Sequence, residues 1–148
     1  MIYKFLGYSS WPENRFSDTH SPYRIWIIGS DNIKKELQEI VTQRLINNRP
    51  IEVYSALTAD AVGDAHIVFV ASNMEQQLPK LAVFAEQNSF MIITEHEQGL
   101  TTGSTINLRF VNQRIGFDIS LTNAQNCGIV LSSRLLAIAT SVNEERRQ

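Results

Sequence analysis

The sequence has little of several residue types that define particular protein classes. Its one cysteine, Cys127, leaves neither an internal disulfide nor a thiolate metal cage available. The longest apolar runs are strand-length segments such as 67–71, far short of the ~20 residues of a membrane-spanning helix. Basic residues number 13 against 15 acidic ones, so no overall positive field is available to neutralise phosphates. The sequence therefore excludes a membrane-spanning domain and argues against nucleic acid as a partner.

The first residues also lack the features of a secretory leader. Segment 1–8 has no basic start, no long apolar stretch and no small-residue cleavage site. The sequence alone thus leaves two alternatives, a cytosolic protein or one whose leader lies outside this chain. A single cysteine does not decide the redox compartment.

The composition is typical of one folded domain. Hydrophobic residues make up 43% and charged residues 19%, which is far from the composition of disordered chains. A chain of 148 residues fits one domain, 1–148, with a single core. The end of the chain, 143–148, is expected to be a solvated, frayed tail.

Apolar segments separated by helical patterns predict a sheet with crossover connections. Strands are predicted at 23–28, 51–55, 67–71 and 90–94. An amphipathic helix is expected after Ser30 or Asp31, with core positions from Ile33 to Leu45, and another is expected after Pro79. Crossovers of this kind favour parallel strands with helices on both faces.

The apolar period changes to two from Thr105 onward, which predicts an antiparallel hairpin turning at Asn112-Gln113. The expected apolar pairs are Ile106 with Ile119, Leu108 with Phe117, and Phe110 with Ile115. Arg109 then lies diagonally from Asp118, within reach of an exposed ion pair worth roughly 0–1 kcal/mol. The predicted class is an α/β single-domain, Rossmann-like mixed sheet, with mostly parallel strands, a C-terminal antiparallel hairpin and helices on both faces.

Two helices are expected to close the chain. Segment 122–125 has the spacing of a capping box, and Gly128 can end the short helix that it opens. The final helix is predicted to begin after Ser132-Ser133. Its expected core stripe consists of Leu135, Ile138, Ala139 and Val142.

The sequence offers no constellation for catalysis or for a bound cofactor. Gly29-Ser-Asp contains one glycine, where phosphate loops use several, and a helix cap is favoured there over a nucleotide loop. The three histidines lie in separate segments without metal-site spacing, and Glu95-His-Glu97 is interpreted as a solvated loop rather than a cation site. No nucleophile elbow or Cys-His pairing occurs. We therefore expect no enzyme, no cofactor and no metal site.

Two further features have alternative interpretations. Cys127 precedes Gly128, where burial as a small hydrophobe is favoured over a redox thiol or an intermolecular disulfide. Aromatic residues near the start are more typical of a core than of a ligand cage, although some could serve an interface. These are Tyr3, Phe5, Tyr8 and Trp11.

Four segments together resemble one known family. They are Tyr3–Pro12, Tyr23–Gly29, Gly103–Leu108 continuing through Ile115–Ile119, and Cys127–Ala137. Their order is similar to that of the YfiR-like family, which has an aromatic first helix ending in Trp-Pro, a strand leading to a glycine, a Gly-x-x-Ile-Asn hairpin and a Ser-Ser-x-Leu-Leu helix. The resemblance covers nearly the whole chain.

The resemblance implies a non-enzymatic periplasmic regulator that binds and restrains a membrane-bound diguanylate cyclase or a similar signalling protein, and so controls cyclic di-GMP and biofilm. It also implies pairing as a homodimer and a first helix that continues upstream of Met1. This chain departs from the founding member, which carries more cysteines, so with only Cys127 intramolecular disulfide control is not expected. The expected partner-binding residues are Ser132, Ser133 and Arg134 at the start of the final helix.

Two other functions stay open. A small-molecule sensor of the envelope would bind its ligand at the carboxyl ends of the strands, near Gly29, Ser72 and Glu95. An enzyme has the least support, because no acid-base, nucleophile or metal arrangement emerges from the residues, although a fold alone does not exclude catalysis.

Overall fold

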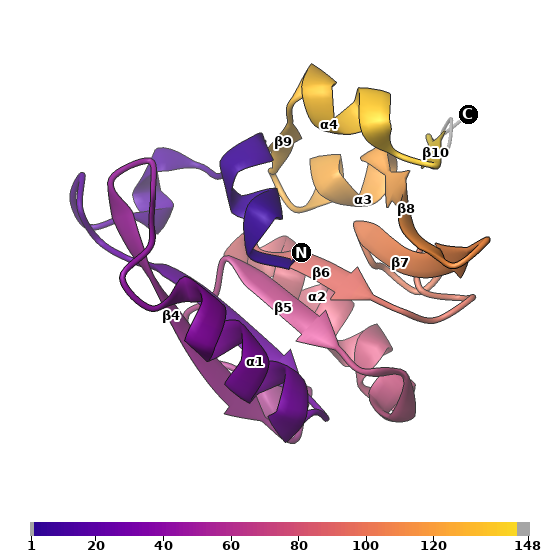
Figure 1. Ribbon diagram of the computed structural model, residues 1–148, viewed down its shortest axis with the longest axis horizontal. Helices are drawn as coiled ribbons and strands as arrows, with labels where there is room; N and C mark the ends of the chain where they lie inside the picture. The colour runs from indigo at the N-terminus through magenta and orange to yellow at the C-terminus, as the bar shows by residue number, and fades with distance from the viewer. Residues whose placement is uncertain (1, 145–148) are drawn as a thin grey trace.

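Eight strands form one mixed sheet in the computed structural model, which describes residues 2–144 (Figure 1). Their order is β10-β8-β7-β6-β5-β2-β4-β3. In chain order the strands are β2 (Tyr23–Ile28), β3 (Leu45–Ile46), β4 (Arg49–Ala56), β5 (Ile67–Val70), β6 (Met91–Thr94), β7 (Ile106–Val111), β8 (Arg114–Ser120) and β10 (Ser141–Asn143). Two short strands, β1 (Ser9–Ser10) and β9 (Val130–Leu131), pair separately.

The centre of the sheet is parallel and its remaining pairings differ. Strands β4, β2, β5, β6 and β7 pair in parallel, β7 and β8 form an antiparallel hairpin, β3 pairs antiparallel with β4, and β10 pairs parallel with β8. The mixed α/β class and the antiparallel hairpin are thereby confirmed. The finer Rossmann-like description stays a prediction.

The two long helices begin and end where local chemistry dictates. Helix α1 (Asp31–Val41) begins at Ser30, whose Oγ accepts a hydrogen bond from the N–H of Ile33 at 3.1 Å. Helix α2 (Leu78–Asn88) has a proline in its first turn and ends at Ser89, which adopts a left-handed φ of 52°. Shorter helices are η1 (Ile2–Tyr8), η2 (Glu13–Arg15), η3 (Ala59–Ala61), η4 (Ser72–Gln77), α3 (Leu121–Asn126) and α4 (Ser133–Ile138).

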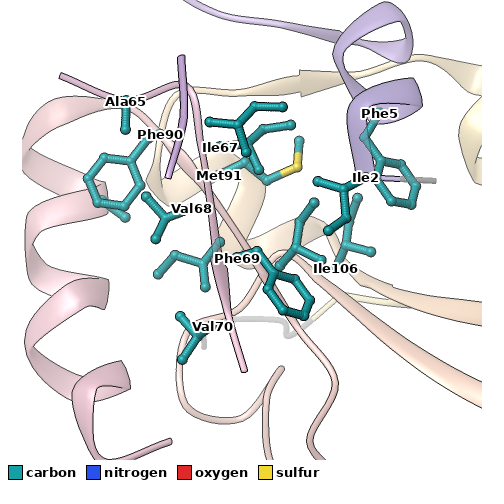
Figure 2. Packing of buried hydrophobic residues seen from close by; sticks show 14 of the residues in the cluster. Ile2, Phe5, Ala65, Ile67, Val68, Phe69, Val70, Phe90, Met91 and Ile106 are labelled. Carbon is teal, nitrogen blue, oxygen red and sulfur yellow. The ribbon is translucent and has the colours of Figure 1, made fainter. Parts of the chain in front are cut away.

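The core lies on both faces of the sheet. Val68 of β5 points toward α2, whereas the neighbouring Phe69 points toward the opposite side, where Ile2 and Phe5 of η1 lie (Figure 2). Val68 and Phe69 are each at most 1% exposed. This two-sided burial explains why β5 is a continuous apolar run rather than an alternating one.

The predicted hairpin register is correct. Ile106 lies opposite Ile119, Leu108 opposite Phe117, and Phe110 opposite Ile115. Both turn residues, Asn112 and Gln113, have positive φ angles, of 50° and 64°. Two such residues produce a turn whose twist matches that of the flanking strands.

The final helix is shorter than predicted. It ends at Ile138, and its predicted core positions Ile138 and Val142 are 64% and 40% exposed. Segment 141–143 instead forms β10, because the edge of β8 offers its backbone groups as partners and Ser141 Oγ donates to Asp118 Oδ1 at 2.6 Å. Asn143, expected in a frayed tail, is therefore the last residue of β10. Residues 145–148 of that tail lie outside the described residues.

The first long helix also ends earlier than predicted. Leu45, expected in its core stripe, lies in β3 and is 64% exposed. The cause is local, because Gln43 adopts a left-handed φ of 67° directly after the C-cap Thr42. A helix cannot continue through that conformation.

Candidate functional site

The residues predicted to bind a partner lie at the start of α4, and they divide into two roles. The Oγ of Ser132 accepts a hydrogen bond from the N–H of Leu135 at 3.2 Å, so Ser132 caps the helix. Ser133 and Arg134 are exposed. Arg134 and Ile138 are four residues apart, which puts them on the same side of α4. This side, the α4 surface, combines a cation with an exposed apolar side chain.

Cys127 is buried and has an environment that opposes redox chemistry. Cys127 is only 4% exposed. Burial, with a smaller contribution from the charge of Glu86, raises the pKa of the Cys127 thiol to about 12. Thiolate reactions need the opposite conditions, namely access and a lowered pKa. The structure therefore agrees with Cys127 as a small buried hydrophobe.

A histidine that the sequence did not single out lies at the centre of a buried aromatic cluster. His66 is 0% exposed, its ring stacks on Phe16 with the centroids 4.8 Å apart, and the rings of Trp11 and Tyr23 meet it at 5.7 and 5.6 Å. The indole N–H of Trp11 donates to the carbonyl of His66 at 3.1 Å. This cluster attaches the N-terminal segment to the ends of β2 and β5, which is a structural role.

The hydrogen bonds of His66 fix its tautomer. The backbone N–H of Arg24 donates to Nδ1 at 3.0 Å, so Nδ1 is unprotonated and Nε2 carries the proton, facing the carbonyl of Arg15 at 3.4 Å. Burial, followed by the nearby Arg15 charge, lowers the pKa of His66 to about 4. The imidazole is therefore held neutral.

Beside the cluster, an ion network links four segments at the surface. Arg15 and Arg24 both bind Asp64, at 2.8 and 2.7 Å, and Arg24 also binds Glu52 at 3.1 Å. Although burial opposes the charged form, the Arg15 guanidinium holds the pKa of Asp64 below its usual value. Because each charge has an opposite partner, the network is a structural clamp rather than an acid-base pair.

The turn after β2 has the geometry of a helix cap. Gly29 has a φ of 90°, and a Cβ at that position would collide with the side chain of Met74. Met74 and Asn73 thus pack closely against the Gly29 turn. The structure favours the cap that Ser30 provides over a nucleotide loop.

The Glu95-His-Glu97 segment leaves the end of β6, and the Nε2 of His96 contacts the carboxylate of Glu75 of η4. Within residues 2–144, no group of three or more histidine, cysteine, aspartate or glutamate side chains is arranged to hold a metal ion.

Across residues 2–144, no helix has the length and apolar character that crossing a membrane would require.

A hollow of about 830 Å³ lies between α1 and the β7–β8 hairpin. We call it the hairpin groove. Its lining residues are Ile33, Glu36, Glu95, His96, Glu97, Asn107, Leu108, Arg109, Phe110, Ile115 and Asp118. Phe110 is 77% exposed, although it lies on the apolar face of the hairpin opposite Ile115. The alternating pattern alone did not show whether Phe110 belongs to the core.

Fold and surfaces together define a mixed α/β domain with exposed apolar surfaces and neutral, buried histidine and thiol groups. The profile of the YfiR/HmsC-like family matches residues 1–140. The chain belongs to that family, which confirms the resemblance seen in its four segments.

Among the solved structures that share the fold is one of low sequence identity. It is the crystal structure of a conserved domain protein from Vibrio cholerae O1 biovar El Tor strain N16961, with a TM-score of 0.61 and 13% identity. The alignment covers 81% of this chain and 54% of that one, so this chain spans about half of its length. A search of curated proteins finds no match.

Proposed function

We propose that the protein is a non-enzymatic regulator of the periplasm that binds and restrains a membrane-bound diguanylate cyclase or a similar signalling protein. In this role it lowers cyclic di-GMP and disfavours biofilm. The observation that carries the proposal is family membership across residues 1–140. A homodimer and an exported location are parts of the same proposal.

The chemistry of the buried groups supports regulation over catalysis. His66 is held neutral inside an aromatic cluster, and the Cys127 thiol is buried with a pKa raised to about 12. Neither group is poised for nucleophilic or acid-base work near neutral pH. A protein that acts through its surface needs neither.

The α4 surface is our proposed contact region for the cyclase. Arg134 supplies a charge and Ile138, 64% exposed, supplies an apolar anchor. Arginines and large apolar side chains dominate the binding energy of many interfaces. Arg134→Glu with Ile138→Ser should weaken binding to the periplasmic segment of the cyclase at least tenfold, because both contacts are lost.

Val83→Ser is the matched control, since Val83 is 53% exposed on the distant helix α2. In cells, deletion of the gene should raise cyclic di-GMP. Unchanged cyclic di-GMP in a strain that carries the cyclase would contradict the proposal.

A small-molecule sensor is the second candidate. A hollow of about 720 Å³ lies at the carboxyl ends of β2 and β4, beside Gly29 and the 77% exposed Leu57. Its size falls in the usual range for ligand sites, and such sites favour this end of a parallel sheet. A ligand-dependent rise in melting temperature that Leu57→Ser abolishes would favour this function.

A further inference from the structure

Strand β7 is longer than the neighbour that covers its inner edge. It runs from Ile106 to Val111, but β6 pairs with it only as far as Asn107. β6 ends its pairing at the Thr94–Asn107 pair, so within residues 2–144 segment 109–111 pairs with β8 alone. The hairpin projects at the right of Figure 1 beyond the rest of the sheet. The edge of β7 that faces away from β8 is therefore open along segment 109–111.

The hairpin groove lies along this open edge. Leu108 is half-buried, whereas Phe110 and Ile115 are 77% and 49% exposed. Across the groove, Ile33 of α1 adds another apolar side chain. The groove thus offers an apolar wall beside unpaired strand backbone, and an open edge of this kind is a template for an added strand.

Apart from the side chains that have a charged partner, the charged residues that line the groove are all acidic. Arg109 is engaged with Asp118 at 3.1 Å, and His96 is engaged with Glu75. The remaining lining charges are exposed carboxylates, namely Glu36, Glu95 and Glu97. An added segment that carried basic residues would neutralise them.

We propose that β7 and the hairpin groove bind an extended segment of a partner protein by strand addition, and that this segment alternates apolar and basic residues. The apolar residues contact Phe110 and Leu108, and the basic ones meet the groove carboxylates. Side chains alternate along a strand, so such a segment presents its apolar residues on one face of the extended sheet and its basic residues on the other. A second copy of this chain is disfavoured, because two acidic grooves would meet.

The inference rests on the proposed function, since it assumes that the domain acts by binding a protein. Its direct test uses the full chain and a synthetic peptide of alternating valine and lysine, followed by fluorescence anisotropy. We expect saturable binding that weakens at least tenfold when glutamate replaces lysine, and again when alternate peptide amides are N-methylated. Equal binding of the N-methylated peptide would overturn strand addition.

Variants of the groove complete the test. Phe110→Ser, and separately Glu95→Gln with Glu97→Gln, should each weaken peptide binding, and the exposure of these side chains leaves folding intact. Val83→Ser and Glu13→Gln are the matched controls, because they remove an exposed apolar side chain of α2 and an exposed carboxylate of η2. Peptide binding that is unaffected by the groove variants would overturn the inference.

Binding of the periplasmic segment of the cyclase distinguishes the strand-addition inference from the proposed function. If it binds the chain and the groove variants leave its affinity unchanged, the strand-addition inference fails and the proposed function stands. If it does not bind while the peptide does, the proposed function fails and the groove remains a peptide site. Self-association that Phe110→Ser abolishes would overturn the choice of a foreign segment.

Discussion

The backbone N–H of Arg24 donates a hydrogen bond to Nδ1 of His66 across 3.0 Å. Only the unprotonated nitrogen can accept that bond. Protonation of His66 would set two donors against each other inside an aromatic cluster and beside the Arg15 guanidinium. The bond therefore links the start of β2 to the entry of β5 through a neutral imidazole.

A loss of stability in acid follows from this bond. The pKa of His66 is about 4 in the folded state, against an ordinary value of 6.5. Above pH 6.5 both states are neutral and His66 contributes no pH dependence. As the pH falls from 6.5 to 4, only the unfolded state gains the proton, so the free energy of unfolding should fall by about 3 kcal/mol. Urea titrations across this range measure it.

His66→Asn is the control for that acid effect. Asparagine can keep an acceptor for the Arg24 N–H but does not titrate. The variant should be less stable at pH 7, by about 1–3 kcal/mol, because the ring contacts with Phe16 are lost. Its stability should nevertheless fall less between pH 6.5 and 4. An unchanged slope would show that other groups cause the acid effect.

Gly29→Ala should destabilise the fold. Gly29 has a φ of 90°, and an added Cβ would collide with Met74. We expect a loss of about 1–3 kcal/mol in the free energy of unfolding. Gly7→Ala is the control, since its Cβ would lie 3.8 Å from Ile46 in ordinary contact. Equal effects of the two substitutions would contradict the strained turn.

Asp118 should contribute more than an exposed ion pair. Its side chain is 14% exposed, and it binds both Arg109 and the Ser141 hydroxyl, the latter at 2.6 Å. Asp118→Ala should cost about 1–3 kcal/mol, because it leaves that hydroxyl unpaired and loosens β10. Ser141→Ala should cost about 1 kcal/mol. Chemical denaturation of both variants measures the difference, and a neutral Asp118→Ala would refute the link.

Cys127 should resist thiol reagents in the folded protein. Its burial and its raised pKa leave little accessible thiolate at pH 8. We expect Ellman's reagent to react with the unfolded chain within minutes and with the folded chain far more slowly. Fast, complete reaction of the folded chain would revive the interpretation of Cys127 as a redox thiol.

Local patterns predicted most of the elements, and tertiary pairing explains what they missed. The Ser30 cap, the helix after Pro79 and the hairpin register depend on near neighbours in sequence, so they were predictable. The end of α4 was not, because β10 forms only when segment 141–143 meets the edge of β8, which the sequence does not place there.

The candidate surfaces also depend partly on local sequence and partly on tertiary pairing. Ser132 could be placed at a helix start from sequence, but the exposure of Ile138 depends on where α4 ends. Alternation put Phe110 on the apolar face, yet the groove exists only because β6 stops pairing at Thr94. The relative lengths of neighbouring strands are set by tertiary structure and not by a local motif.

Binding of the purified protein to the periplasmic segment of a membrane diguanylate cyclase from the same organism is the most direct test of the central claim. The account predicts saturable binding with a Kd of about 1 μM or tighter, weakened at least tenfold by Arg134→Glu with Ile138→Ser and unchanged by Val83→Ser. No binding at concentrations on the order of 100 μM would contradict it.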